Sequence, residues 1–137
     1  MTQANTTRSV KDWHRKTWHD KTEAPGTNLL RVEILHRYEG IIEGEGSIQY
    51  LIAENKNLTG STIALEKVTG SVDGRSGSFV FQQIGTFDHG KLKMTLTVVP
   101  GSGTDQLSGL CGQATLESEL HQEIYSIPFD YTFEETK

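Results

Sequence analysis

Apolar and polar residues alternate with a period of two along most of the chain after Leu29. Leu30, Val32 and Ile34 alternate with Arg31 and Glu33, so the apolar side chains of this segment share one face of an extended strand. The same alternation recurs over 41–54, 91–99 and 121–134. No segment carries the i, i+3, i+4, i+7 repeat of an amphipathic helix. The pattern predicts an all-β chain whose strands have one buried and one solvated face.

Turn residues separate the alternating segments. Asp73-Gly74 and His89-Gly90 stand between strong strand patterns, as the connections of short hairpins do. The combined pattern predicts eight strands, at about 8–18, 28–37, 41–54, 60–72, 76–87, 91–99, 107–118 and 121–134. Eight short-linked antiparallel strands favour an up-and-down barrel, which has no free edge, and a two-sheet sandwich is the alternative. We expect a single β-barrel domain over residues 1–137, with 1–7 as a loose N-terminal segment.

Two of the predicted strands, 60–72 and 76–87, carry apolar residues on both faces. Ile63 and Leu65 oppose Ala64 and Val68 in the first, and the second has the same two-sided character. Because both faces are apolar, periodicity does not say which face points inward. An apolar outer face also predicts a cover, which is either a terminal segment or another subunit, and we expect a homo-oligomer.

Composition and charge narrow the class of protein. The chain has 137 residues, with 13 Lys and Arg against 18 Asp and Glu, a net charge of −5 at pH 7. An acidic chain disfavours binding to nucleic acid, which requires a basic face. Cys111 is the single cysteine, so no internal disulfide forms, which fits a reducing compartment. The sequence shows neither a signal peptide nor an apolar run long enough to span a membrane, and we expect a cytoplasmic protein without a membrane partner.

Glu66 is the most informative candidate for function, because it shares a face with Ala64 and Val68. A carboxylate buried among apolar side chains must be paired, hydrogen-bonded or protonated. Tyr50, Glu66 and Gln82 lie on the predicted strands 41–54, 60–72 and 76–87. If the faces that carry them point inward, these three side chains form a polar cluster inside an apolar cavity. A few polar groups among apolar walls are typical of a small-ligand pocket. A purely structural hydrogen-bond network is the alternative interpretation.

The other candidate motifs carry weaker signals. Arg75 follows the Asp73-Gly74 turn, where its guanidinium and nearby backbone donors suggest a weak anion site. The five histidines show no metal-ligand spacing, so we expect no metal and no cofactor. These histidines are His14, His19, His36, His89 and His121.

Several short strings, taken together, resemble one bacterial family. They are EGEG at 43–46, LEKVxG at 65–70, GRSGSFV at 74–80, GxFD at 85–88, VVPGSGT at 98–104 and LxGLxG at 107–112. The family is a domain of unknown function whose fold resembles the allene oxide cyclase barrel. The resemblance implies an eight-stranded antiparallel barrel but no reaction and no catalytic residues. Where many members carry His after the motif glutamine, this chain has Gln83.

The leading interpretation is a barrel that binds a small, mainly apolar molecule, with Tyr50, Glu66, Gln82 and Arg75 as candidate ligand-binding residues. One alternative is an interaction module, in which the barrel is filled and an outer apolar face binds another copy. The other is a cofactor-free enzyme of cyclase or isomerase type, in which Glu66 acts with a raised pKa. We do not favour catalysis over binding.

Overall fold

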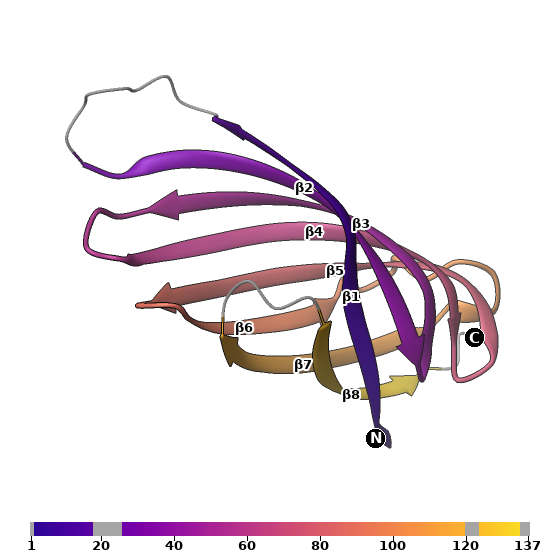
Figure 1. Cartoon of the computed structure of the whole chain (residues 1–137). Coiled ribbons are helices and arrows are strands. Elements are labelled where there is room, and N and C mark those ends of the chain that lie inside the picture. Colours follow the sequence, from indigo (N-terminus) through magenta and orange to yellow (C-terminus); the bar gives the residue numbers. More distant parts are fainter. Residues whose placement is uncertain (1, 18–25, 120–123, 135–137) are drawn as a thin grey trace.

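The computed structural model describes residues 2–17, 26–119 and 124–134, and its eight antiparallel strands close into a barrel in sequence order (Figure 1). The strands are β1 (Thr2–Thr17), β2 (Asn28–Gly40), β3 (Ile42–Glu54), β4 (Thr59–Val72), β5 (Arg75–Asp88), β6 (Lys91–Val98), β7 (Leu110–Glu119) and β8 (Ile124–Phe133). This confirms the up-and-down barrel and excludes the sandwich. In the described part of the chain no helix is long and apolar enough to cross a membrane.

Two tight turns mark the two ends of the barrel. Asp73 and Gly74, with φ of 52° and 79°, join β4 to β5, and His89 and Gly90, with φ of 48° and 86°, join β5 to β6. Two successive residues with positive φ are typical of a type I′ turn, whose twist matches that of the flanking strands. Both predicted hairpin connections are therefore confirmed. We call the two ends of the barrel the Asp73 end and the His89 end.

The N-terminal residues close the barrel. Residues 2–9 pair with β8, from Thr2 opposite Tyr131 to Ser9 opposite Ile124. The expectation of a loose segment over 1–7 is therefore wrong for residues 2–7. The physical reason is that β8 would otherwise present a free edge of unpaired backbone groups.

The start of β7 also differs from the prediction. A 3₁₀ turn, η1 (Asp105–Leu107), precedes this strand and places Leu107 in the core with 1% of its surface exposed. The predicted strand 107–118 therefore begins at Leu110.

Aromatic side chains fill the Asp73 half of the interior. Phe79 and Phe81 meet edge to face with ring centroids 4.9 Å apart, and Phe81 meets Phe129 in the same way at 5.6 Å. All three are fully buried. The inward face of β5 is therefore the one that carries the phenylalanines, and Ile84 on the opposite face is 55% exposed.

The ladder between β7 and β8 stops partway. It runs from Leu110 opposite Phe133 to Ala114 opposite Phe129 and includes none of the remaining residues of either strand. The end of β7 and the start of β8 lie apart in Figure 1. We call this break, between Thr115–Glu119 and Ile124–Pro128, the seam.

Pro128 explains why the ladder between β7 and β8 stops at the seam. The Glu134 N–H donates to the Gly109 carbonyl at 2.8 Å, so the even-numbered residues of β8 direct their N–H groups toward β7. Pro128 is the first even-numbered residue beyond the ladder and has no N–H to donate.

Replacing Pro128 by threonine is expected to extend this ladder, because it supplies the missing donor on the side that faces β7. Backbone amides of Thr115–Glu119 should then exchange with deuterium more slowly than in the wild type, by roughly tenfold or more if the segment becomes a stable ladder. Hydrogen exchange followed by mass spectrometry measures this. Unchanged exchange in Pro128→Thr would show that the proline does not hold the seam open, and Lys91–Val98 serves as the internal reference.

Candidate functional site

A cluster of buried polar side chains crosses the middle of the barrel. Its members come from five strands and are each at most 8% exposed. We call them the buried network: Arg8, His36, Tyr38, Tyr50, Glu66 and Gln83.

The Glu66 carboxylate is the centre of this network. Its Oε1 accepts hydrogen bonds from Tyr38 Oη at 2.6 Å and Gln83 Nε2 at 2.9 Å, and lies 3.5 Å from Arg8 Nη1. Its Oε2 lies 2.7 Å from His36 Nδ1. Glu66 itself is fully buried. A buried carboxylate with this many donors meets the condition under which a charge is tolerated in a protein interior.

Arg8 supplies the opposite charge. Its Nη1 donates to Gln83 Oε1 at 3.1 Å and contacts Tyr38 Oη at 3.4 Å, and the residue is 1% exposed. Its guanidinium carbon lies 6.0 Å from the ring centroid of Tyr125, the residue opposite it on β8. Its Nε has no hydrogen-bond partner in the described part of the chain.

A glycine on the neighbouring strand makes room for the carboxylate. A Cβ at Gly46 would overlap Glu66 Oε2, would lie 2.8 Å from Glu66 Cδ and would lie 3.1 Å from Tyr38 Cε2. The EGEG string of the sequence therefore has a packing explanation at its last glycine, because only a residue without a side chain fits beside Glu66.

The environment fixes the charge of each group. Burial by itself raises the pKa of Glu66, but the hydrogen bond from His36 and the charge of Arg8 outweigh it, so the pKa lies below its ordinary value. Burial lowers the pKa of His36, and its bond to Glu66 only partly opposes this. Burial, followed by the charge of Glu66, raises the pKa of Tyr38. At neutral pH the network therefore holds cationic Arg8, anionic Glu66 and a neutral His36 whose Nδ1–H donates, with a net charge of zero.

These shifts predict that the protein loses stability in acid. The unfolded chain takes up a proton on His36 near the ordinary pKa of 6.5, and on Glu66 near 4.5, whereas the folded chain resists both protons. The free energy of unfolding should therefore fall as the pH drops below about 6.5, and fall further below about 4.5. Urea denaturation between pH 4 and 8 measures this profile. In His36→Gln, whose amide still donates to Glu66, the decline between pH 7 and 5 should be reduced, and an identical decline would contradict the assignment.

Two of the predicted site residues lie in the network. Tyr50 contributes its hydroxyl, 3.5 Å from Gln83 Oε1, and Glu66 is the centre. Gln82 does not join them, because it is exposed on the outer face of β5 and its neighbour Gln83 takes the inward position opposite Ala64. The expected inward position of Gln82 is wrong by one residue, and a shift of one residue in a strand moves a side chain to the opposite face.

Arg75 also lies away from the network. It is exposed at the Asp73 end, and its guanidinium carbon stacks 3.9 Å from the ring centroid of Phe133. The N–H of the following residue, Ser76, donates to Gln106 Oε1. The structure therefore gives Arg75 an aromatic partner and does not bring it together with Tyr50 or Glu66.

Sequence reasoning missed four members of the network: Gln83, for which Gln82 was chosen, and also Arg8, His36 and Tyr38. His36 and Tyr38 continue the alternation of Leu30 and Val32 on β2, so period two was a usable signal for both. Arg8 carried no such signal, because it lies at the border of a segment expected to be loose. Among the described residues no group of three or more His, Cys, Asp and Glu could hold a metal ion, and His19 and His121 lie outside those residues.

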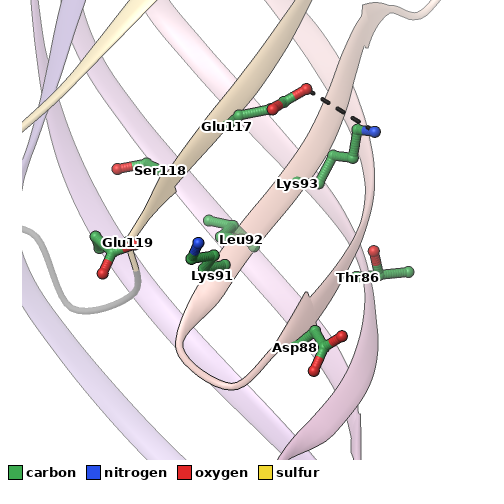
Figure 2. Close-up of a pocket in the computed structure, with 8 residues that line it drawn as sticks. All are labelled: Thr86, Asp88, Lys91, Leu92, Lys93, Glu117, Ser118 and Glu119. Carbon is green, nitrogen blue, oxygen red and sulfur yellow. Dashed lines mark ion pairs between the residues drawn. The ribbon is translucent and has the colours of Figure 1, made fainter.

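The described surface has two concavities. The larger, of about 660 Å³, lies across the ends of β5, β6 and β7, and its lining includes Lys93 and Glu117, 3.9 Å apart (Figure 2). The smaller, of about 270 Å³, includes Asp12 and His14 beside Glu33 on β2. Neither is lined by a member of the buried network.

The interior at the His89 end differs from the aromatic half. Thr62, Ala64 and Gly85 put small side chains or none on the inward face there. Thr62 is 6% exposed, and its Oγ1 has no hydrogen-bond partner in the described part of the chain. The inward side chains of Ile52 and Phe87 are half-buried, so these two residues border solvent at this end of the barrel.

Residues 4–131 match the model of a family described as DUF3224, a protein of unknown function. The chain belongs to this family. A DUF3224 protein of unknown function from Shewanella oneidensis MR-1 has a similar crystal structure, with a TM-score of 0.73 and 29% sequence identity. The similarity covers 98% of this chain and 100% of the Shewanella protein. No curated protein matches the sequence. The family of unknown function predicted from the sequence strings is therefore confirmed.

Proposed function

We propose that this DUF3224 protein binds a small, neutral and mainly apolar molecule at the His89 end of the barrel. One observation carries the proposal: Thr62 Oγ1 and Arg8 Nε are buried polar atoms without hydrogen-bond partners in the described part of the chain. An unpartnered buried polar group costs on the order of 1–3 kcal/mol, which a ligand with an acceptor oxygen would offset.

The charges of the network support a neutral ligand. Arg8 and Glu66 already balance each other, so an anionic ligand would leave a net negative charge in the interior, which is costly. Both unpartnered groups can donate a hydrogen bond. A molecule with a carbonyl or similar oxygen would accept a hydrogen bond from such a donor, and an apolar body would suit the apolar neighbours of Thr62.

The side chains at this end support the location. Leu30, Ile52 and Met94 lie in the same cross-strand row as Thr62 and Gly85, and give that row its apolar character. The half-buried Tyr125 lies at the seam and contacts Arg8. A ligand that entered at the seam would approach the guanidinium past the ring of Tyr125.

We favour binding over catalysis. A carboxyl that serves as a general base or acid at neutral pH needs a raised pKa, whereas the pKa of Glu66 lies below its ordinary value. We also propose a cytoplasmic location, which the unpaired thiol of Cys111 supports.

The test compares two probes with the same chain length, 2-decanone and decanoate, by calorimetric titration of the full chain. We expect the neutral ketone to bind at least tenfold more tightly than the anion. Thr62→Val removes the hydroxyl with little change of shape, and should weaken ketone binding roughly five- to tenfold. The matched control is Thr95→Val on the outer face of β6, which should bind like the wild type.

Native mass spectrometry of gently purified protein complements the titration. A small molecule present in the native spectrum and released on denaturation would support the proposal, and its mass would begin to identify it. An apo mass together with no saturable binding of either probe would overturn the proposal in favour of a filled barrel. Tighter binding of decanoate than of 2-decanone would overturn the proposal that the ligand is neutral.

A further inference from the structure

The outer side of β3 to β7 carries a block of uncharged residues. The strand register arranges ten outward positions in two adjacent rows, which we call the uncharged face. One row is Leu51, Ile63, Ile84, Thr95 and Thr115, and the other is Gln49, Leu65, Gln82, Thr97 and Gln113. The strands that carry them lie side by side in the barrel wall.

The centre of this face is apolar and exposed. Ile63, Leu65 and Ile84 are 53%, 59% and 55% exposed, and they are cross-strand or next-but-one neighbours on β4 and β5. Charged residues make up 23% of the whole chain, yet none occupies the ten positions. Loss of charge around an apolar centre is the compositional signal of an interface core.

We propose that a second copy of this chain covers the uncharged face in a two-fold symmetric dimer. The proposal is independent of the ligand site, which lies inside the barrel. The distribution of charge over the surface is the reason for choosing a second copy of the chain as the partner. Two copies with a net charge of −5 each repel one another over most of their surfaces.

The uncharged face is where this repulsion is weakest. The residues that border it in register or along the strands carry three positive and three negative charges, so the face and its rim are neutral. These bordering charges are Arg31, Lys67, Lys93, Glu33, Glu117 and Asp130. The excess negative charge of the chain therefore lies elsewhere.

The chemistry of the face is also self-complementary. The side chains of Gln49, Gln82 and Gln113 both donate and accept hydrogen bonds, as do the threonine hydroxyls, so the same groups can pair with their own copies. A two-fold contact requires this, because it places the same patch of each protomer against the other.

The area is sufficient for a dimer. Strands about 4.8 Å apart, with outward residues about 6.8 Å apart along each strand, give each outward residue roughly 33 Å² of sheet. The ten positions and their bordering residues then cover roughly 750 Å². A stable interface buries about 800 Å² per partner.

Sedimentation velocity of the full chain between 1 and 100 μM tests the proposal. The wild type is expected to sediment as a dimer, at twice the chain mass of 15.2 kDa. Ile63→Glu places a charge in the middle of the face on each protomer and should raise the dimer dissociation constant at least a hundredfold. Thr95→Arg, at a polar position of the same face, should also weaken the dimer.

Ile124→Glu is the matched control, since Ile124 is 62% exposed and lies outside the face. It should leave the dimer intact. Circular dichroism checks that each variant keeps its strands, and retained 2-decanone binding separates this proposal from the ligand site. A monomeric wild type at 100 μM, a trimer or larger assembly, or a dimer that persists in both Ile63→Glu and Thr95→Arg would overturn the proposal.

Discussion

Replacing Glu66 by glutamine is expected to destabilise the protein by about 3–5 kcal/mol, the usual cost of removing one partner from a buried ion pair. The variant keeps the size of the side chain but leaves the buried Arg8 guanidinium without its counter-charge. The new amide also puts an N–H₂ group in place of one carboxylate oxygen, so it faces either the donor of His36 or those of Tyr38 and Gln83. Urea denaturation at pH 7 measures the loss.

Glu45→Gln provides the control for this prediction. Glu45 also pairs with a cation, Lys11, at 2.8 Å, but both side chains are at least half exposed. Surface pairs of this kind contribute little, so no measurable change is expected. An Arg8→Met/Glu66→Met double variant removes both charges and should recover part of the stability lost in Glu66→Gln. Equal and small effects of Glu66→Gln and Glu45→Gln would refute the central role of the buried carboxylate.

Replacing Gly46 by alanine is expected to cost about 1–3 kcal/mol, because the interior has no space for the added methyl group. The new Cβ would overlap Glu66 Oε2 and press on the ring of Tyr38. The carboxylate would have to move away from the hydrogen bond that His36 donates to it. The loss should appear in the urea midpoint without a change of slope.

A double-mutant cycle tests this cause. In a Glu66→Ala background the clash partner is absent, so adding Gly46→Ala should cost much less than in the wild type. Ser47→Ala, one residue along on the exposed outer face, should be close to neutral. If Gly46→Ala costs the same in both backgrounds, Gly46 is required for a reason other than the space for Glu66.

The strands were predictable because they depend on local rules. Alternation along 28–37 and 91–99 marked two strands that the structure contains, and Asp73-Gly74 and His89-Gly90 marked two hairpins. The start of β1 at Thr2 was not predictable in this way. Polar residues dominate 2–9, and the pairing of this segment with β8 is a contact between the two ends of the chain.

The candidate site was only partly predictable. Glu66 and Tyr50 were predicted to face inward because the residues two positions away on the same strand face are apolar, and the structure buries both. Gln82 was chosen over Gln83 because both faces of β5 are apolar, and the chain offers no local reason to bury Phe81 rather than Ile84. The register of β5 against β4 decides it, since it places Gln83 beside Ala64 on the inner face.

By itself the sequence determined the β-class of the protein, its number of strands and two of its hairpin turns, while the choice of a barrel over a sandwich needed the tertiary structure. Hydrophobic alternation and turn residues are local signals, because each extends over only a few residues. Each strand or turn can therefore be predicted from its own segment of the chain. Only the tertiary structure decided which face of β4 and β5 is inside and which strands supply partners to Glu66. Those partners, Arg8, His36, Tyr38 and Gln83, come from three other strands, 17 to 58 residues away. Period two separates two faces of a strand, but closure of the barrel is what makes one of them the interior.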